Sequence, residues 1–139
     1  MTVKGIIDSG AILALLDDRD EWHDRCRHAF EDIRLPLATT AAALAELFHL
    51  LFRERRDAAA AWAFLRSGAI RILPITDSDS GELERLMRRY ADRPMDFADA
   101  TLVRLAEREA LTTILTVDHD DFETYRIGAK KRFRIVPSR

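Results

Sequence analysis

Short apolar segments alternate with helical segments along the whole chain, and this alternation limits the possible folds more than any other feature. Strands are expected at residues 3–7, 37–39, 70–75, 113–117 and 133–136, and helices at 9–16, 21–32, 41–53, 57–66, 77–90 and 96–109. Brief apolar strands between helices are typical of a parallel sheet that is covered on both faces. We therefore predict an α/β fold, a three-layer α/β/α sandwich with a central parallel sheet, in one domain over residues 1–139.

The composition fits a globular domain and excludes several classes of protein. The 139 residues are 47% hydrophobic and 33% charged, and the formal net charge of −2 gives no global field that would select nucleic acid or membrane. Cys26 is the single cysteine, which excludes an internal disulfide and a zinc site built on thiolates. The first ten residues lack the features of a signal peptide, and the apolar stretch 41–52 is too short to span a bilayer. We expect a cytoplasmic protein.

Two of the expected strands end in an aspartate. Asp8 follows the first strand, and Asp118 follows the strand at 113–117. In open α/β sheets, ligands bind beyond the carboxyl ends of the strands, so these two side chains are candidates for chemistry. Each aspartate alone is explained equally well as a cap of the next helix, because Asp and Ser favour helix starts. Ser9 is placed to cap the helix at 9–16 in the same way.

Three further acids lie on helices where burial is expected. Asp96 and Asp99 open the helix at 96–109 on the same side as its apolar stripe, where a carboxylate loses hydration unless a positive group meets it. Glu46 stands among apolar residues of the helix that Thr40 can cap. Glu46 is open to a second interpretation, since it shares a helix face with His49 that could simply be solvated.

Taken together, the acids favour a metal site over a nucleophilic side chain. Carboxylates held close together repel one another, and a hard divalent cation such as Mg²⁺ or Mn²⁺ reverses that cost. The cation can activate a water and stabilise charge that develops on a phosphate. Cys26 has His23 and His28 nearby in sequence, but no signature of a cysteine nucleophile surrounds it. The chain also lacks a glycine-rich phosphate loop and a nucleophile elbow.

The acidic positions occur in four segments whose order and separation match a known family. The segments read IIDSG at 6–10, AE at 45–46, MDFADA at 95–100 and TVDHDDF at 116–122. With these motifs the chain resembles the PIN-domain nucleases and, among them, the VapC-type toxins of toxin–antitoxin pairs. The resemblance covers nearly the whole chain.

The resemblance implies a catalytic, metal-binding acidic quartet made of Asp8, Glu46, Asp99 and Asp118. It implies that Asp96 is an accessory acid, that Ser9 is the small hydroxyl residue beside the first aspartate, and that Asp121 holds the loop rather than the metal. The implied activity is Mg²⁺- or Mn²⁺-dependent endonucleolytic cleavage of RNA by a metal-activated water.

The charges from residue 126 to the end of the chain are all positive. We predict that Lys130, Lys131 and Arg132 contact phosphates of the RNA substrate. The alternative is an ordinary solvated basic tail.

The helical hairpin at 41–66 carries more apolar surface than one helix face can bury. Its aromatic residues are Phe48, Phe52, Trp62 and Phe64. The surface could pack entirely on the sheet, could form a homodimer, or could accept an apolar segment of a cognate antitoxin, as the resemblance implies. We predict that these four aromatic residues bind a protein partner.

Two other functions are compatible with parts of the pattern. A housekeeping PIN nuclease would process RNA without an antitoxin. A receiver-like switch domain also gathers acids at strand ends, but it needs a lysine near the site, and a helical Glu46 fits it poorly.

Overall fold

A computed structural model describes residues 2–34 and 36–139 of the chain. Its main sheet contains five parallel strands in the order β3-β2-β1-β4-β7. The strands are β1 (Ile6–Ile7), β2 (Leu37–Thr39), β3 (Ile70–Ile72), β4 (Thr113–Leu115) and β7 (Arg134–Val136). The chain moves outward from β1 through β2 to β3 and then returns to the other side of β1 with β4. The order therefore reverses between β1 and β4, which is the position where ligands bind in open α/β sheets.

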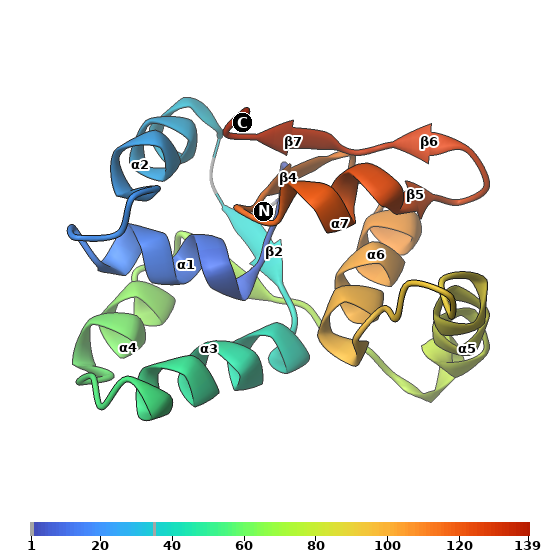
Figure 1. The fold of residues 1–139 in the computed structure, drawn as a ribbon, viewed down its shortest axis with the longest axis horizontal. Coiled ribbons are helices and arrows are strands. Elements are labelled where there is room, and N and C mark those ends of the chain that lie inside the picture. Colours follow the sequence, from blue (N-terminus) through green and yellow to red (C-terminus); the bar gives the residue numbers. More distant parts are fainter. Residues whose placement is uncertain (1, 35) are drawn as a thin grey trace.

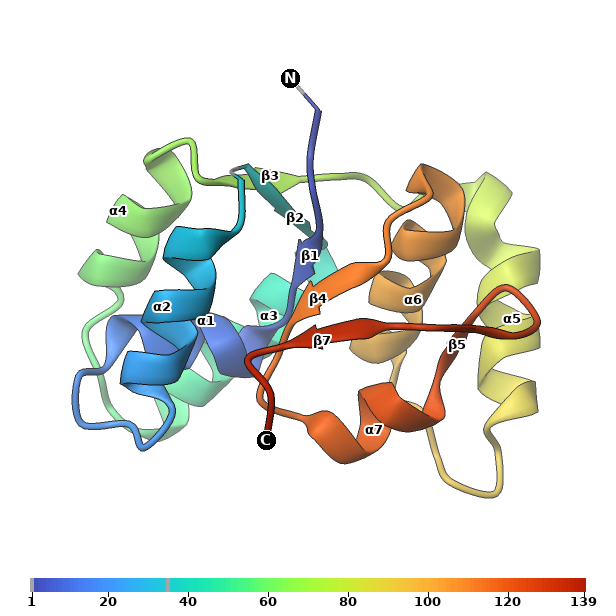
Figure 2. The ribbon, with the colours of Figure 1, turned by 90° about the horizontal axis from the view of Figure 1, so that it is seen from above.

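Helices cover both faces of the sheet, so the predicted α/β/α sandwich is confirmed (Figures 1 and 2). On one face lie α1 (Ser9–Leu16), α2 (His23–Asp32), α3 (Ala41–Arg53) and α4 (Ala59–Arg66), and on the other lie α5 (Ser80–Arg89), α6 (Phe97–Glu109) and α7 (His119–Thr124). Successive strand residues enter opposite cores: Ile6 packs with the α5–α7 side and Ile7 with the α1–α4 side. In the described ranges, no helix is both long enough and apolar enough to cross a bilayer.

Several element boundaries differ from the sequence-based expectations. The first strand is shorter than 3–7, and the helix expected at 77–90 begins with a 3-10 turn, η1 (Asp77–Asp79). Ser9 does not cap α1, because Asp8 occupies the cap position and its Oδ1 accepts from the Ala11 N–H at 3.0 Å. The short helix α7 and the antiparallel hairpin of β5 (Arg126–Ile127) and β6 (Lys131–Arg132) were not predicted, because such brief elements carry no usable periodicity.

Candidate functional site

The candidate site lies at the carboxyl edge of β1 and β4, where the strand order reverses. These two strands are hydrogen-bonded neighbours with Ile7 opposite Leu115, and Asp8 and Asp118 come shortly after them. The Asp8 N–H donates to the Leu115 carbonyl at 3.3 Å, so the chain is still held in register where the carboxylate begins. Asp99 belongs to the first turn of α6. The fold therefore brings acids from three distant segments to one edge of the sheet.

The hydroxyl of Thr116 connects two of these acids. Thr116 Oγ1 donates to Asp8 Oδ2 and accepts from the Asp118 N–H at 2.9 Å. The first oxygen of Asp8 already caps α1, so both carboxylate oxygens of this buried residue have partners. Asp118 caps α7 in turn, since its Oδ1 accepts from the Asp121 N–H at 3.3 Å. Both aspartates therefore cap helices, as one interpretation of the sequence predicted. They also lie with Asp99 at this edge of the sheet, and we call Asp8, Asp99 and Asp118 the acidic cluster.

Asp99, Asp118 and Asp121 form the closest group of carboxylates. Each offers one oxygen such that all three oxygens lie within 4.8 Å of one another. Asp121 Oδ1 also pairs with Arg93 at 3.1 Å, and the expectation that Asp121 holds the loop rather than the metal stays a prediction. The Tyr125 hydroxyl donates to Asp99 Oδ2 at 3.0 Å and orients that carboxylate.

Glu46 and Asp96 flank the cluster. Ser9 Oγ donates to Glu46 Oε1 at 2.9 Å across 37 residues of sequence, so Glu46 is held from α1 and is not simply part of a solvated stripe. Asp96 is exposed and caps α6 by accepting from the Asp99 N–H at 2.8 Å. The negative charge of Glu46 helps to raise the pKa of Asp8, and the negative charge of Asp96 helps to raise the pKa of Asp99.

The carboxylates of the cluster resist ionisation. Burial, reinforced by the charge of Asp96, raises the pKa of Asp99 to about 8. Burial also raises the pKa of Asp8 to about 6, although hydrogen bonds from Thr116 and the Ala11 N–H oppose the shift. The pKa of Asp118 rises to about 6, again mainly through burial. Within residues 2–34 and 36–139, no salt bridge reaches any of these three aspartates. A cluster of oxygen donors that lacks a counter-charge fits a hard divalent cation.

The basic residues singled out in the sequence lie elsewhere. Lys131 and Arg132 form β6, and the turn of the β5–β6 hairpin is anchored where the Gly128 N–H donates to Glu107 Oε2 at 2.9 Å. Glu107 follows Asp99 by eight residues on α6, a rise of about 12 Å along the helix. The hairpin therefore packs near the opposite end of α6 from the cluster (Figure 1). Contact of Lys130, Lys131 and Arg132 with RNA stays a prediction.

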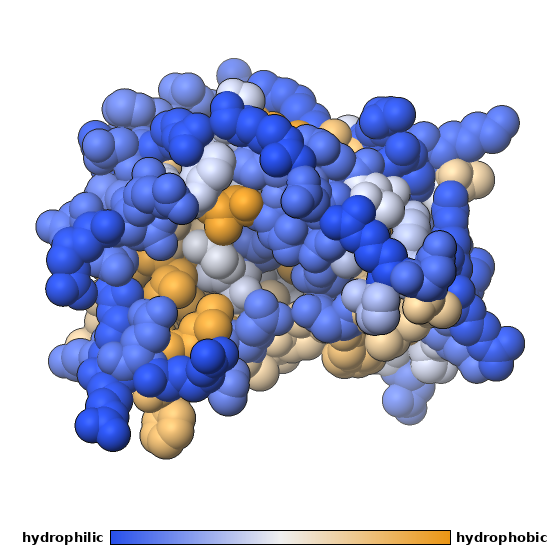
Figure 3. All heavy atoms as spheres, in the orientation of Figure 1, coloured by the Kyte–Doolittle hydropathy of each residue, from blue (hydrophilic) through white to orange (hydrophobic). Residues whose placement is uncertain are grey.

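The aromatic residues of the α3–α4 hairpin differ in exposure. Phe52 is 82% exposed and Trp62 is 51% exposed, and the Trp62 ring lies 4.7 Å from that of Phe48. Phe64 points inward and packs on Phe30 of α2 with ring centroids 5.6 Å apart. Apolar side chains gather in a hollow over α1, α3 and α4 in the space-filling view (Figure 3). Phe52 and Trp62 are thus available to a partner, whereas Phe64 is already packed.

Sequence reasoning assigned no role to Thr116 or Tyr125. Thr116 stands in the TVDHDDF segment, two residues before Asp118, and its position at a strand end was an available signal. Tyr125 follows the unpredicted helix α7, and nothing in the local sequence links it to Asp99. Both residues act by contacts between segments, which the pattern of a single segment does not reveal.

Comparison with known proteins places these features in a family. A family model described as the PIN domain matches residues 6–128. The chain is 30% identical to Ribonuclease VapC26 of Mycobacterium tuberculosis over 135 residues, which cover 95% of this chain and 99% of that protein. Among solved structures, VapC20 of Mycobacterium tuberculosis, described as a sarcin-ricin loop cleaving toxin, aligns with a TM-score of 0.73 at 20% identity, over 85% of this chain and 94% of that one. A toxin–antitoxin complex from Klebsiella pneumoniae aligns with a TM-score of 0.66 at 15% identity, over 87% and 92% of the two chains.

Proposed function

The chain belongs to the PIN-domain family, and on that premise we propose that it is a metal-dependent endoribonuclease that acts as the toxin of a type II toxin–antitoxin pair. One observation carries the proposal: where the strand order reverses, Asp99 and Asp118 lie close together, the charge of Asp8 acts on Asp99, and no cationic side chain of the described residues pairs with these three acids. The similarity to a relative named as a ribonuclease supports the same activity.

The proposed ligands of a divalent cation are Asp8, Asp99 and Asp118, with Glu46 completing the quartet and Asp96 as an accessory acid. Bound Mg²⁺ or Mn²⁺ would activate a water and neutralise charge on the phosphodiester in the transition state. Asp121 lies close enough to join Asp99 and Asp118 at the ion, although its Oδ1 also pairs with Arg93.

The neighbouring side chains hold the acids in place. Thr116 sets the distance between the Asp8 carboxylate and the Asp118 backbone, and Tyr125 fixes one oxygen of Asp99. Ser9 orients Glu46 toward the site, which gives the predicted role of Ser9 in substrate positioning a physical basis. Such fixed orientation lowers the cost of assembling the site when substrate arrives.

The test is cleavage of RNA by purified protein with Mg²⁺, compared among the wild type, Asp8→Asn, Asp99→Asn and the control Asp92→Asn. Asp92 is an exposed aspartate outside the cluster. We expect both cluster variants to lose about a thousand-fold in rate, since the cation contributes several kcal/mol to the barrier. The control should retain wild-type activity. Full activity of Asp8→Asn and Asp99→Asn at saturating Mg²⁺ would refute the assignment of the ligands.

A protein partner is the second part of the proposal. We expect an antitoxin segment to cover the exposed aromatic surface of α3 and α4, where Phe48, Phe52 and Trp62 would anchor it. Trp62→Asp should abolish protection by the small protein encoded beside this gene during co-expression, whereas Met87→Asp on α5 should not. Met87 is also exposed, at 37%, but it belongs to the helices on the other face of the sheet. If the protein encoded beside this gene does not bind the wild type, the toxin function is wrong and the housekeeping nuclease becomes the preferred function. Homodimerisation would then explain the exposed aromatic surface of α3 and α4.

A further inference from the structure

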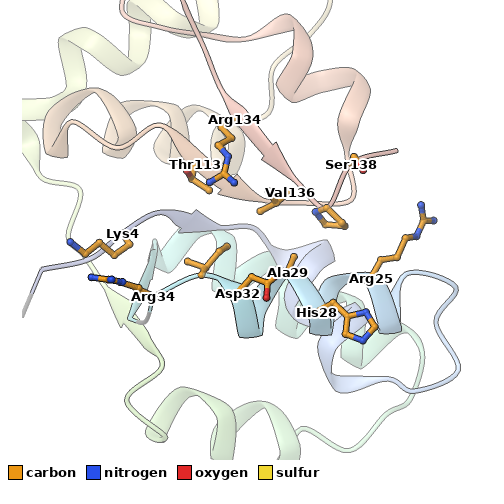
Figure 4. Close-up of a pocket in the computed structure, with 12 residues that line it drawn as sticks. Lys4, Arg25, His28, Ala29, Asp32, Arg34, Thr113, Arg134, Val136 and Ser138 are labelled. Carbon is orange, nitrogen blue, oxygen red and sulfur yellow. The ribbon is translucent and has the colours of Figure 1, made fainter.

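A groove of about 550 Å³ runs between helix α2 and strand β7, at the edge of the sheet. Its floor is apolar and includes Ala29 of α2, Ile33 directly after that helix, and Val136 of β7. Figure 4 shows Lys4 and Arg34 at one end of the groove, Arg25 and Ser138 at the other, and Arg134 between the ends. The acidic cluster does not line this groove.

The walls of the groove carry four cations and one carboxylate. The cations are Lys4, Arg25, Arg34 and Arg134, and the acid is Asp32. In the part of the chain that the structure describes, none of the four cations forms a salt bridge. Other arginines on the surface, such as Arg85 and Arg139, are paired with carboxylates at about 3 Å. Unpaired cations facing a groove are available to an anionic ligand.

Arg25 connects this groove to the acidic cluster. It also lines a second, smaller cavity together with Asp118, His119 and Arg139. Its guanidinium lies over the Trp22 ring at 3.7 Å from the centroid, which holds the side chain at the junction of the two cavities. Arg25 is thus a lining residue of both cavities, and the smaller one, which Asp120 also lines, lies between the groove and Asp118.

We propose that this groove binds the phosphate backbone of the RNA strand that extends from the cleavage site. The inference rests on the proposed function, since it assumes that RNA occupies the acidic cluster. The segment of α2 from Arg25 to Asp32 rises by about 10 Å, which accommodates about three phosphates at the 3.4 Å spacing of a stacked strand. The apolar floor would lie against ribose and base surfaces, while Arg25, Arg34 and Arg134 meet the phosphates.

A polynucleotide fits these features better than an acidic peptide does. The groove shares Arg25 with the cavity that Asp118 lines, and the cations are spread along the groove rather than concentrated at one point (Figure 4). The groove is distinct from the β5–β6 hairpin, whose basic residues lie near the far end of α6.

The experiment compares the double variant Arg34→Ala/Arg134→Ala with the control Arg66→Ala/Arg71→Ala. Arg71 is the counterpart of Arg134, because each is an exposed arginine on an outer strand, β3 at one edge of the sheet and β7 at the other. Binding of single-stranded oligouridylate of increasing length is measured in a chelator, so that no cleavage is required, over a range of salt concentrations. Thermal unfolding checks that both double variants keep their fold.

We expect the groove variant to lower the slope of log K against log salt by about 1.4, which corresponds to two phosphate contacts on a single strand. The control should leave the slope unchanged. With Mg²⁺, the groove variant should raise KM for long oligonucleotides and leave kcat nearly unchanged. Equal slopes in the two double variants would refute RNA binding in the groove. A groove variant that loses binding of poly-glutamate but keeps binding of RNA would refute it as well. Failure of the wild type to cleave, with the slope difference retained, would refute the nuclease and not the groove.

Discussion

Asp79 and Asp99 are two partly or fully buried acids of this chain that differ in the charged side chains around them. Asp79, at the start of α5, has a side chain only 2% exposed and receives Arg104 at 2.8 Å and Arg108 at 2.9 Å. Its Oδ2 also accepts from the Thr76 N–H, and these contacts lower its pKa. Asp99 lies at the other end of the same helix that supplies both arginines, yet its pKa rises to about 8. Cationic side chains compensate the charge of Asp79, whereas no cationic side chain of the described residues pairs with Asp99.

The difference is what we expect between an acid that stabilises the fold and an acid of the proposed metal site. The contacts of Asp79 join the start of α5 to the end of α6. The negative charge of Asp79 is matched there by two arginines of the protein itself. Asp8, Asp99 and Asp118 receive hydrogen bonds from hydroxyls and backbone N–H groups but no cation from the described residues. Like charges held in a partly buried site cost stability, and that cost persists in natural proteins mainly where a ligand offsets it.

The pH dependence of stability should have opposite signs at the two sites. Asp99, with a pKa of about 8, keeps its proton in the folded state at pH values where the unfolded chain, with a pKa near 3.8, has lost it. Stability of the metal-free protein should therefore fall as pH rises from about 4 to about 8, by up to about 1.4 kcal/mol per pH unit for each proton. Asp8 adds to the slope only up to about pH 6.

Denaturant unfolding in a chelator at several pH values checks this prediction. Asp99→Asn should flatten the slope at neutral pH, and Asp92→Asn should not. Asp79 has a lowered pKa, so its contribution should be lost only in acid, as pH falls below about 4 through the folded-state value. A metal-free wild type whose stability rises between pH 5 and pH 8 would contradict the contrast.

Divalent cations should stabilise the protein through the cluster alone. A ligand that binds only the folded state adds about 2.7 kcal/mol when its concentration is 100 times Kd. We expect this gain with Mg²⁺ for the wild type and for Asp79→Asn, and its loss in Asp99→Asn. Calorimetric or denaturant unfolding with and without Mg²⁺ measures the gain. An equal gain in all three proteins would place the cation elsewhere.

The fold was predictable because its evidence is local, whereas half of the site depends on contacts between segments. Pairs such as Ile6 and Ile7, buried on opposite faces, indicate strands covered on both sides, and Asp8 and Asp118 come shortly after such strands. Asp121 and Tyr125 come from a six-residue helix and the residue after it, which show no periodic stripe. Their proximity to Asp99 depends on how α7 packs on α6, and no local pattern encodes that packing.

Removal of the charge at Asp79 should cost stability, whereas removal at Asp99 should not. Asp79→Asn weakens two charge-assisted hydrogen bonds from Arg104 and Arg108, and we expect a loss of about 2 kcal/mol. Asp99→Asn removes a carboxyl that must take up a proton on folding at pH 7, so the metal-free variant should be at least as stable as the wild type at that pH. Denaturant unfolding at pH 7 in a chelator gives both values. Destabilisation of Asp99→Asn as large as that of Asp79→Asn would remove the distinction.

The smallest effect is expected at Tyr125, whose hydroxyl is the donor to Asp99 Oδ2 at 3.0 Å. Tyr125→Phe keeps the ring, which packs edge-on against Tyr90 and Phe122, and removes one hydrogen bond worth about 1 kcal/mol. Because Asp99 then loses an orienting contact, the affinity for Mg²⁺ should fall several-fold and kcat should fall with it, while KM for RNA changes little.

Tyr90→Phe is the matched control for this prediction. Its ring packs against the Tyr125 ring, but its hydroxyl accepts from the Arg126 N–H at 2.9 Å and forms no hydrogen bond with a described acid of the cluster. Tyr90→Phe should therefore lose similar stability and keep its Mg²⁺ affinity. If the two variants lose Mg²⁺ affinity equally, Tyr125 acts only through packing. If only Tyr125→Phe loses Mg²⁺ affinity, the Tyr125 hydroxyl positions Asp99. Asp99 would then depend on a neutral hydrogen-bond donor, whereas Asp79 is held by two arginines.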